Sequence, residues 1–121
     1  MTHERQDAAA EPRALVRSFA DAVERMGARD WAEGIILEEA DFAPEFFDLR
    51  SGLAGELFQK CVNYGLRVAI VLPNVQVHGQ RFRELAYEHR SHPVVRVVGS
   101  RALADAWLQA ARAESRGREA Q

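Results

Sequence analysis

Polar residues able to recognise an anion or a partner protein gather in one short stretch of the sequence. Asp48, Arg50, Ser51 and Gly52 directly precede a segment whose apolar residues recur at helical spacing. A helix beginning at Ser51 would point its unpaired backbone N–H groups and the positive end of its dipole at this turn. Arg50 adds a cation there, and Asp48 adds a hydrogen-bond acceptor. The stretch therefore predicts a binding or switch surface.

Apolar runs and amphipathic segments alternate along the chain, and they must position this turn. The runs are rich in Val and Ile and predict strands over residues 34–38, 67–72 and 94–98. Apolar residues at helical spacing predict helices over residues 12–26, 51–64, 82–89 and 100–113. The order α-β-α-β-α-β-α predicts an α/β fold with a small, three-stranded, mainly parallel sheet and about four helices.

Several local features of these elements are predicted as well. The first helix is expected to begin at Pro12, with Leu15 and Val16 on its apolar stripe. Residues 75–80 are expected to form a loop. Ser51 and Ser100 are expected to be N-cap residues of their helices. The last helix is expected to bury Leu103, Ala106, Trp107 and Ala110.

Ligands and partners of open parallel sheets usually bind beyond the carboxyl ends of the strands. Asn74 follows the second predicted strand and Ser100 follows the third, so both belong to that edge. The predicted binding or switch surface therefore comprises Asp48, Arg50, Ser51, Gly52, Asn74 and Ser100, with the loop after Leu72 beside it.

Simpler structural roles compete with a functional reading of these residues. Ser51 is also explained as a helix cap, and Asp48 with Arg50 as a local ion pair. Cys61 lies on the apolar face of a predicted helix and is interpreted as a core residue. The sequence contains no phosphate-binding loop, dinucleotide motif or nucleophile elbow. We therefore expect no catalytic residues, no metal and no cofactor, and we favour a protein that is not an enzyme.

Length and composition indicate a single globular domain. The chain has 121 residues, a net charge of −2 and one cysteine. We expect the domain to span residues 13–114, between a disordered leader over residues 1–12 and a flexible tail over residues 115–121. The near-neutral charge does not favour nucleic acid, and no apolar run approaches the ~20 residues of a membrane span. The expected location is the cytoplasm.

Several stretches resemble the bacterial domain-of-unknown-function family numbered 4180. The resemblance rests on residues 46–49, 52–56, 59–60, 63–64, 69–71 and 87–88. Residues 48–55 also resemble the Asp-Ser-Ser-Gly-Leu-Gly signature of STAS domains, the anti-sigma-factor-antagonist fold. Ser51 matches the second serine of that signature, whereas Arg50 stands where the phosphorylated serine of STAS proteins would be. The order of elements over residues 14–113 also agrees with a STAS-like architecture.

The resemblance implies two strands before the first helix, and this chain has no strand-like run there. A three-stranded sheet would leave an unpaired edge, so we expect self-association or a partner protein. Strands encoded upstream of Met1 are the alternative explanation. The function expected is a non-enzymatic STAS-like interaction or regulatory module. The alternative is a binder of a small anion or nucleotide-type ligand, or a weak enzyme, that uses the helix N-termini at Ser51 and Ser100.

Overall fold

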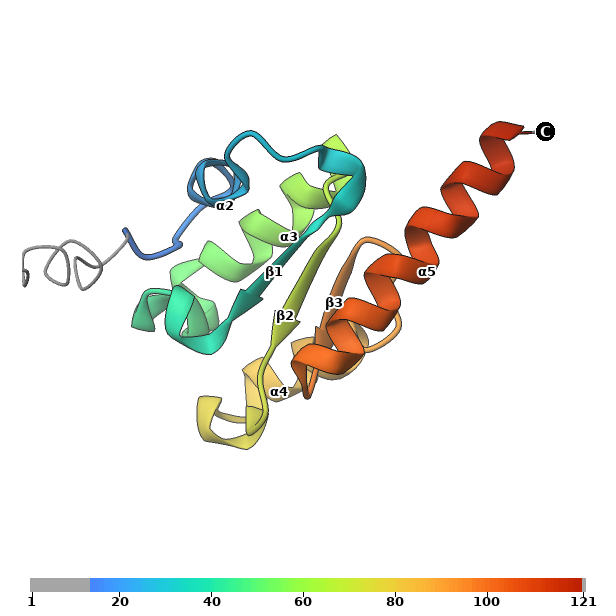
Figure 1. The fold of residues 1–121 in the computed structure, drawn as a ribbon. Coiled ribbons are helices and arrows are strands. Elements are labelled where there is room, and N and C mark those ends of the chain that lie inside the picture. Colours follow the sequence, from blue (N-terminus) through green and yellow to red (C-terminus); the bar gives the residue numbers. More distant parts are fainter. Residues whose placement is uncertain (1–13, 121) are drawn as a thin grey trace, which may run out of the picture.

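The protein was analysed as a computed structural model that describes residues 14–120 (Figure 1). The predicted leader lies outside this part of the chain. A parallel three-stranded sheet of order β1-β2-β3 is combined with four α-helices, which confirms the predicted α/β fold. The elements are α2 (Phe19–Met26), β1 (Ile35–Glu38), α3 (Leu53–Tyr64), β2 (Val68–Val71), α4 (Gln80–Glu88), β3 (Val95–Val98) and α5 (Arg101–Ala120).

Helices cover both faces of the sheet and create two hydrophobic clusters. On the central strand, Val68 and Ile70 point to the larger cluster, which they share with α2, α3 and α4. Ala69 and Val71 belong to the smaller cluster, which they share with Ala104 of α5. Helix α5 lies on the opposite face of the sheet from α2 and α3 (Figure 1). All four residues of β2 are buried, which explains the unbroken apolar run in the sequence. None of the helices in the described chain is both long enough and apolar enough to cross a membrane.

The first helix starts later than predicted. Ser18 is its N-cap, and the Ser18 hydroxyl accepts a hydrogen bond from the Asp21 N–H at 3.2 Å. Val16 is extended: its N–H donates to the Asp41 carbonyl at 2.8 Å, and its carbonyl accepts from the Ala43 N–H at 3.1 Å. The prediction of a helical Val16 was therefore wrong, because a pairing distant in sequence overrides its local helical spacing.

The last helix packs through a different face from the one predicted. The sequence favoured a buried face of Leu103, Ala106, Trp107 and Ala110. That prediction was wrong for Leu103, Ala106 and Ala110, which are exposed, whereas Trp107 is half-buried and packs against the second cluster. The buried residues of the helix are Ala104, Leu108 and Ala111, and Leu103 is 56% exposed. Ala104 lies in one cluster with Ala69 of β2, so two small residues meet where helix and sheet pack. The helix also includes residues 115–120, for which a tail was predicted.

The outer edge of β3 is covered by the connection from α4. Val95 and Val97 direct their backbone groups away from β2 in the parallel register. The Val97 N–H donates to the His89 carbonyl at 3.0 Å. The Val95 N–H donates to Nδ1 of His92 at 3.2 Å, and the Val94 N–H donates to the same nitrogen at 3.0 Å. These outward N–H groups of β3 are therefore satisfied within the chain.

The observed face of α5 can be tested with two matched substitutions. Leu108→Ala should lower the free energy of unfolding by about 2–4 kcal/mol, because it removes a buried side chain. Leu103→Ala is the same change on an exposed position of the same helix and should stay within about 0.5 kcal/mol. Urea denaturation measures both, and the reverse order of effects would support the face predicted from sequence.

His92 should make stability depend on pH. Desolvation, with the nearby charges of His89 and Arg96, lowers the pKa of His92 below its ordinary value. Protonation at Nδ1 would also remove the acceptor for two N–H groups. The contribution of His92 is therefore complete above about pH 6.5, the pKa of an unfolded histidine, and is lost as the pH falls toward the lower folded pKa.

His92→Asn should flatten this pH dependence, because the Asn carbonyl oxygen can accept the same N–H groups and does not titrate. Urea unfolding at about pH 7.5 and about pH 5.5 compares the variant with the wild type across the histidine range. His92→Ala, which lacks an acceptor, should be less stable than the wild type at the higher pH. If His92→Asn keeps the wild-type slope, another group causes the pH dependence.

Candidate functional site

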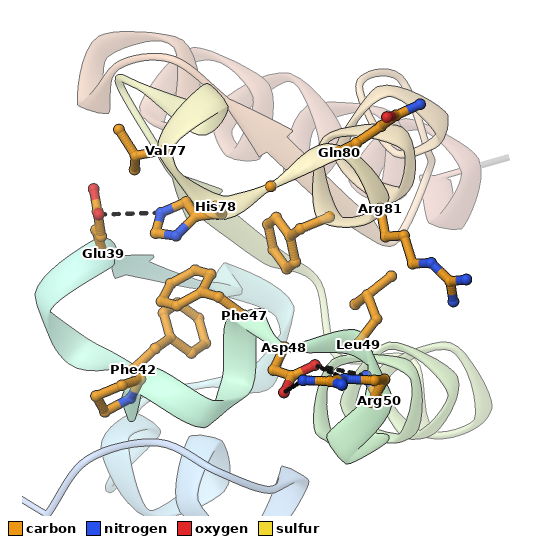
Figure 2. Close-up of a pocket in the computed structure, with 13 residues that line it drawn as sticks. Glu39, Phe42, Phe47, Asp48, Leu49, Arg50, Val77, His78, Gln80 and Arg81 are labelled. Carbon is orange, nitrogen blue, oxygen red and sulfur yellow. Dashed lines mark hydrogen bonds and ion pairs between the residues drawn. The ribbon is translucent and has the colours of Figure 1, made fainter.

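An open groove of about 900 Å³ lies at the carboxyl edge of the sheet (Figure 2). We call it the carboxyl-edge groove. One wall comes from residues 39–50, the connection that leaves β1. The other wall comes from residues 77–82, which end the connection after β2 and begin α4. The groove therefore occupies the edge at which parallel sheets usually bind ligands and partners.

Aromatic rings form the base of the carboxyl-edge groove. Phe46 is fully buried beneath it, with its ring centroid 4.2 Å from that of Phe42 and 5.5 Å from that of Phe47. Its ring also lies 6.2 Å from Phe82 of α4. Phe42, Phe47 and Phe82 all line the groove. Burial of Phe46 therefore holds the two walls against one core.

His78 and Phe47 join the two walls directly. Their rings stack with centroids 3.8 Å apart and planes inclined by 12°. Nε2 of His78 lies 3.1 Å from Oε2 of Glu39 on the opposite wall (Figure 2). The two groups are not oriented for a hydrogen bond. Nε2 is therefore a buried nitrogen without a hydrogen-bond partner among the described residues. Both stacked residues line the groove.

Asp48 and Arg50 form an exposed ion pair on the rim. Nε of Arg50 donates to Oδ1 of Asp48 at 3.1 Å, and a terminal nitrogen donates to Oδ2 at 3.2 Å. The hydrogen bonds from Arg50 lower the pKa of Asp48, and the hydrogen bond to Asp48 raises the pKa of Arg50. The guanidinium side chain is 83% exposed. Each charge on this rim is therefore largely offset by the other.

Ser51 and Gly52 lie beside the groove and do not line it. Gly52, not Ser51, is the N-cap residue of α3, so the predicted cap was wrong by one position. Gly52 has φ 78° and ψ −4°, a left-handed conformation that glycine adopts without steric cost. The Ser51 hydroxyl donates to the Glu45 carbonyl at 2.9 Å and accepts from the Leu53 N–H at 3.2 Å. Its hydrogen bonds therefore hold the turn together.

Asn74 and Ser100 follow their strands as predicted but do not reach the groove. Asn74 is exposed and makes no side-chain cap at η5 (Val75–His78). The Ser100 hydroxyl accepts from the Leu103 N–H at 3.2 Å, as expected of a helix cap. Of the six predicted residues, only Asp48 and Arg50 line the groove.

Two residues of the second wall, His78 and Arg81, were missed by sequence reasoning. The segment that carries His78 was predicted as a loop, whereas residues Val75–His78 form a 3₁₀ helix. Gly79 then precedes α4 and has no side chain to cap it, so the first turn of α4 opens toward the groove beside Arg81. The loop after Leu72 was expected beside the predicted surface, because it follows a strand end, but neither residue was singled out within it.

The side chains with chemical reactivity are arranged for packing. Burial raises the pKa of the Cys61 thiol to about 12, so the thiol stays protonated near neutral pH and is a poor nucleophile. Within residues 14–120, no group of His, Cys, Asp and Glu side chains is arranged to hold a metal ion. The groove thus offers aromatic surface and charged rim groups, which suit binding.

Comparison with known proteins gives one match. Neither a curated protein nor a solved structure matches the sequence. The matching family covers residues 7–108, which is most of the chain. On this basis the protein belongs to the family described as Domain of unknown function (DUF4180).

Proposed function

We propose that the protein is a non-enzymatic, STAS-like interaction module that binds a partner protein in the carboxyl-edge groove. The observation that carries the proposal is the groove itself, an open groove at the strand ends with a partly apolar lining and charged residues on its rim. Buried aromatic anchors surrounded by polar groups are typical of protein-binding surfaces. The groove also coincides with the turn at residues 48–52 and the connection after β2.

Arg81 favours an acidic group within an otherwise apolar segment of the partner. Arg50 is paired with Asp48, and Glu39 lies against His78. Arg81 takes part in none of the ion pairs found among residues 14–120. The positive end of the α4 dipole adds to its charge. A carboxylate of the partner would meet Arg81 while an apolar side chain contacts Phe47, which is half-buried, and Val77, which is 62% exposed.

The STAS-like assignment is supported by the order of elements. A buried parallel strand leads into a turn, the turn leads into α3, and two further strand–helix units follow. The turn carries Asp48, Ser51 and Gly52, the residues that resemble the STAS signature. A regulatory role without catalysis is supported by the buried Cys61 and by the Ser51 hydroxyl, whose partners are backbone groups.

The alternative function, anion binding at the helix N-termini of Ser51 and Ser100, has less support. Both hydroxyls accept a hydrogen bond from a backbone N–H of the helix that follows. An anion at either helix would compete with this capping contact. A separate titration with inorganic phosphate tests this alternative.

Binding can be tested with short synthetic peptides that carry Leu and Phe between acidic residues. Matched peptides carry Lys in place of the acids. The acidic peptide should shift the backbone amide NMR signals of residues 79–82 and 47–50, and the lysine peptide should not. Arg81→Glu should lower the affinity for the acidic peptide by about fivefold or more, because the attraction between residue 81 and the acidic groups of the peptide becomes a repulsion.

Arg83→Glu is the matched control, since it makes the same charge change on the same helix outside the groove. It should leave peptide affinity unchanged. Equal binding of the acidic and lysine peptides, or signal shifts confined to other faces, would refute the assigned partner chemistry. Shifts caused by phosphate alone, at residues 51–54 or 100–103, would favour the anion-binding alternative.

A further inference from the structure

The outer edge of β1 differs from that of β3, because part of it is open. The Ile35 N–H donates to the Arg67 carbonyl at 3.0 Å, which sets the alternation of the β1–β2 ladder. The backbone N–H and carbonyl groups of Ile35 and Leu37 therefore point toward β2. Those of Ile36 point outward, away from β2. No backbone partner of Ile36 is found on this side within the described chain. An edge residue with both groups exposed can pair with another strand.

The chain limits this open edge to one residue. The Glu38 N–H also points outward, but it donates to Oδ2 of Asp41 at 2.7 Å. At the other end, the Gly34 N–H donates to the Trp31 carbonyl at 3.0 Å. Ile36 is thus the one residue of this edge, between Gly34 and Glu38, that offers a free N–H together with a carbonyl. Any strand that pairs here must be centred on Ile36.

A groove of about 370 Å³ follows the same edge. It is lined by the whole of β1 and by three arginines: Arg25 of α2, Arg29 of the connection after α2, and Arg101 of α5. Arg25 is paired with Asp41 at 2.7 Å, and Arg101 is paired with Glu38 at 2.7 Å. Arg29 takes part in none of the ion pairs found among residues 14–120.

We propose that the outer edge of β1 pairs with the same edge of a second copy of this chain. A two-fold axis midway between the two Ile36 residues makes the strands antiparallel, and these residues exchange both N–H···O=C hydrogen bonds. A two-fold contact needs only one self-complementary residue pair at its centre, and Ile36 supplies it. The two sheets then form one continuous sheet across the pair.

The charges beside β1 are complementary under the same two-fold axis. Arg29 and Glu33 lie near Gly34 at the start of β1, on the side that α5 covers. Glu38 and Arg101 lie on that side at the other end of the strand. Antiparallel pairing about Ile36 sets Glu38 of the second copy opposite Gly34, and Gly34 has no side chain to obstruct it. Each end of the contact then contains both signs of charge, and Arg29 meets a carboxylate.

Two measurements on the full chain test this proposal. Sedimentation from about 10 µM to about 1 mM should show a monomer that converts to a dimer as concentration rises. Hydrogen exchange of the Ile36 amide should slow over the same range, because the amide becomes bonded in the dimer. The Val97 amide is the internal control: it already donates to the His89 carbonyl, so its exchange should not change.

Arg29→Glu should raise the dimer dissociation constant by about tenfold or more, because two attractions become repulsions. Arg83→Glu makes the same charge change on α4, away from the outer edge of β1, and should leave the dimer dissociation constant unchanged. Circular dichroism checks that both variants fold. A monomer throughout the range would overturn the proposal, as would a dimer whose Ile36 amide exchanges at a rate independent of concentration. Neither result depends on the carboxyl-edge groove, so the two proposals can fail separately.

Discussion

Burial of the Phe46 ring is the contact on which the geometry of the carboxyl-edge groove depends. Phe46 belongs to the long connection between β1 and α3. This connection contains three short 3₁₀ helices and neither an α-helix nor a β-strand. Complete burial of a phenylalanine side chain contributes about 1.5–3 kcal/mol, more than a typical surface contact. Because the ring lies among Phe42, Phe58 and Phe82, it fixes the connection to both α3 and α4. Phe47 and Asp48 can then project from the surface at defined places.

The sheet was predictable from sequence because helices cover both of its faces, and strands buried on both faces appear in the sequence as apolar runs. The Val-Ala-Ile-Val run of β2 is apolar at every position, and each of these positions is buried. By contrast, local spacing could not determine which side of α5 meets the sheet. Alanine occurs on several sides of that helix, so the apolar pattern allows more than one face. Packing of Ala104 in one cluster with Ala69 and Val71 decides between them, and this cluster joins residues distant in sequence.

The site was predictable in part for a similar reason. Asp48 and Arg50 stand close together in sequence and meet in the structure, so a local pattern was sufficient to find them. His78 acts through its stack on Phe47 and its contact with Glu39, and both partners belong to a different connection. Nothing in the residues around His78 indicates these contacts. They arise because parallel crossovers return the chain to the same edge of the sheet after each strand.

Consecutive residues at the end of β1 serve two separate surfaces. Glu38 turns toward Arg101 and the outer edge, whereas Glu39 turns toward His78 and the groove. The two carboxylate oxygens of Asp41 make separate contacts: Oδ2 accepts the Glu38 N–H, and Oδ1 pairs with Arg25. This short segment is therefore held from the α2 side, the α5 side and the groove at once. The ion pairs and the hydrogen bond from the Glu38 N–H keep it in one conformation, so each surface is presented ready-formed, which lowers the ordering cost of binding.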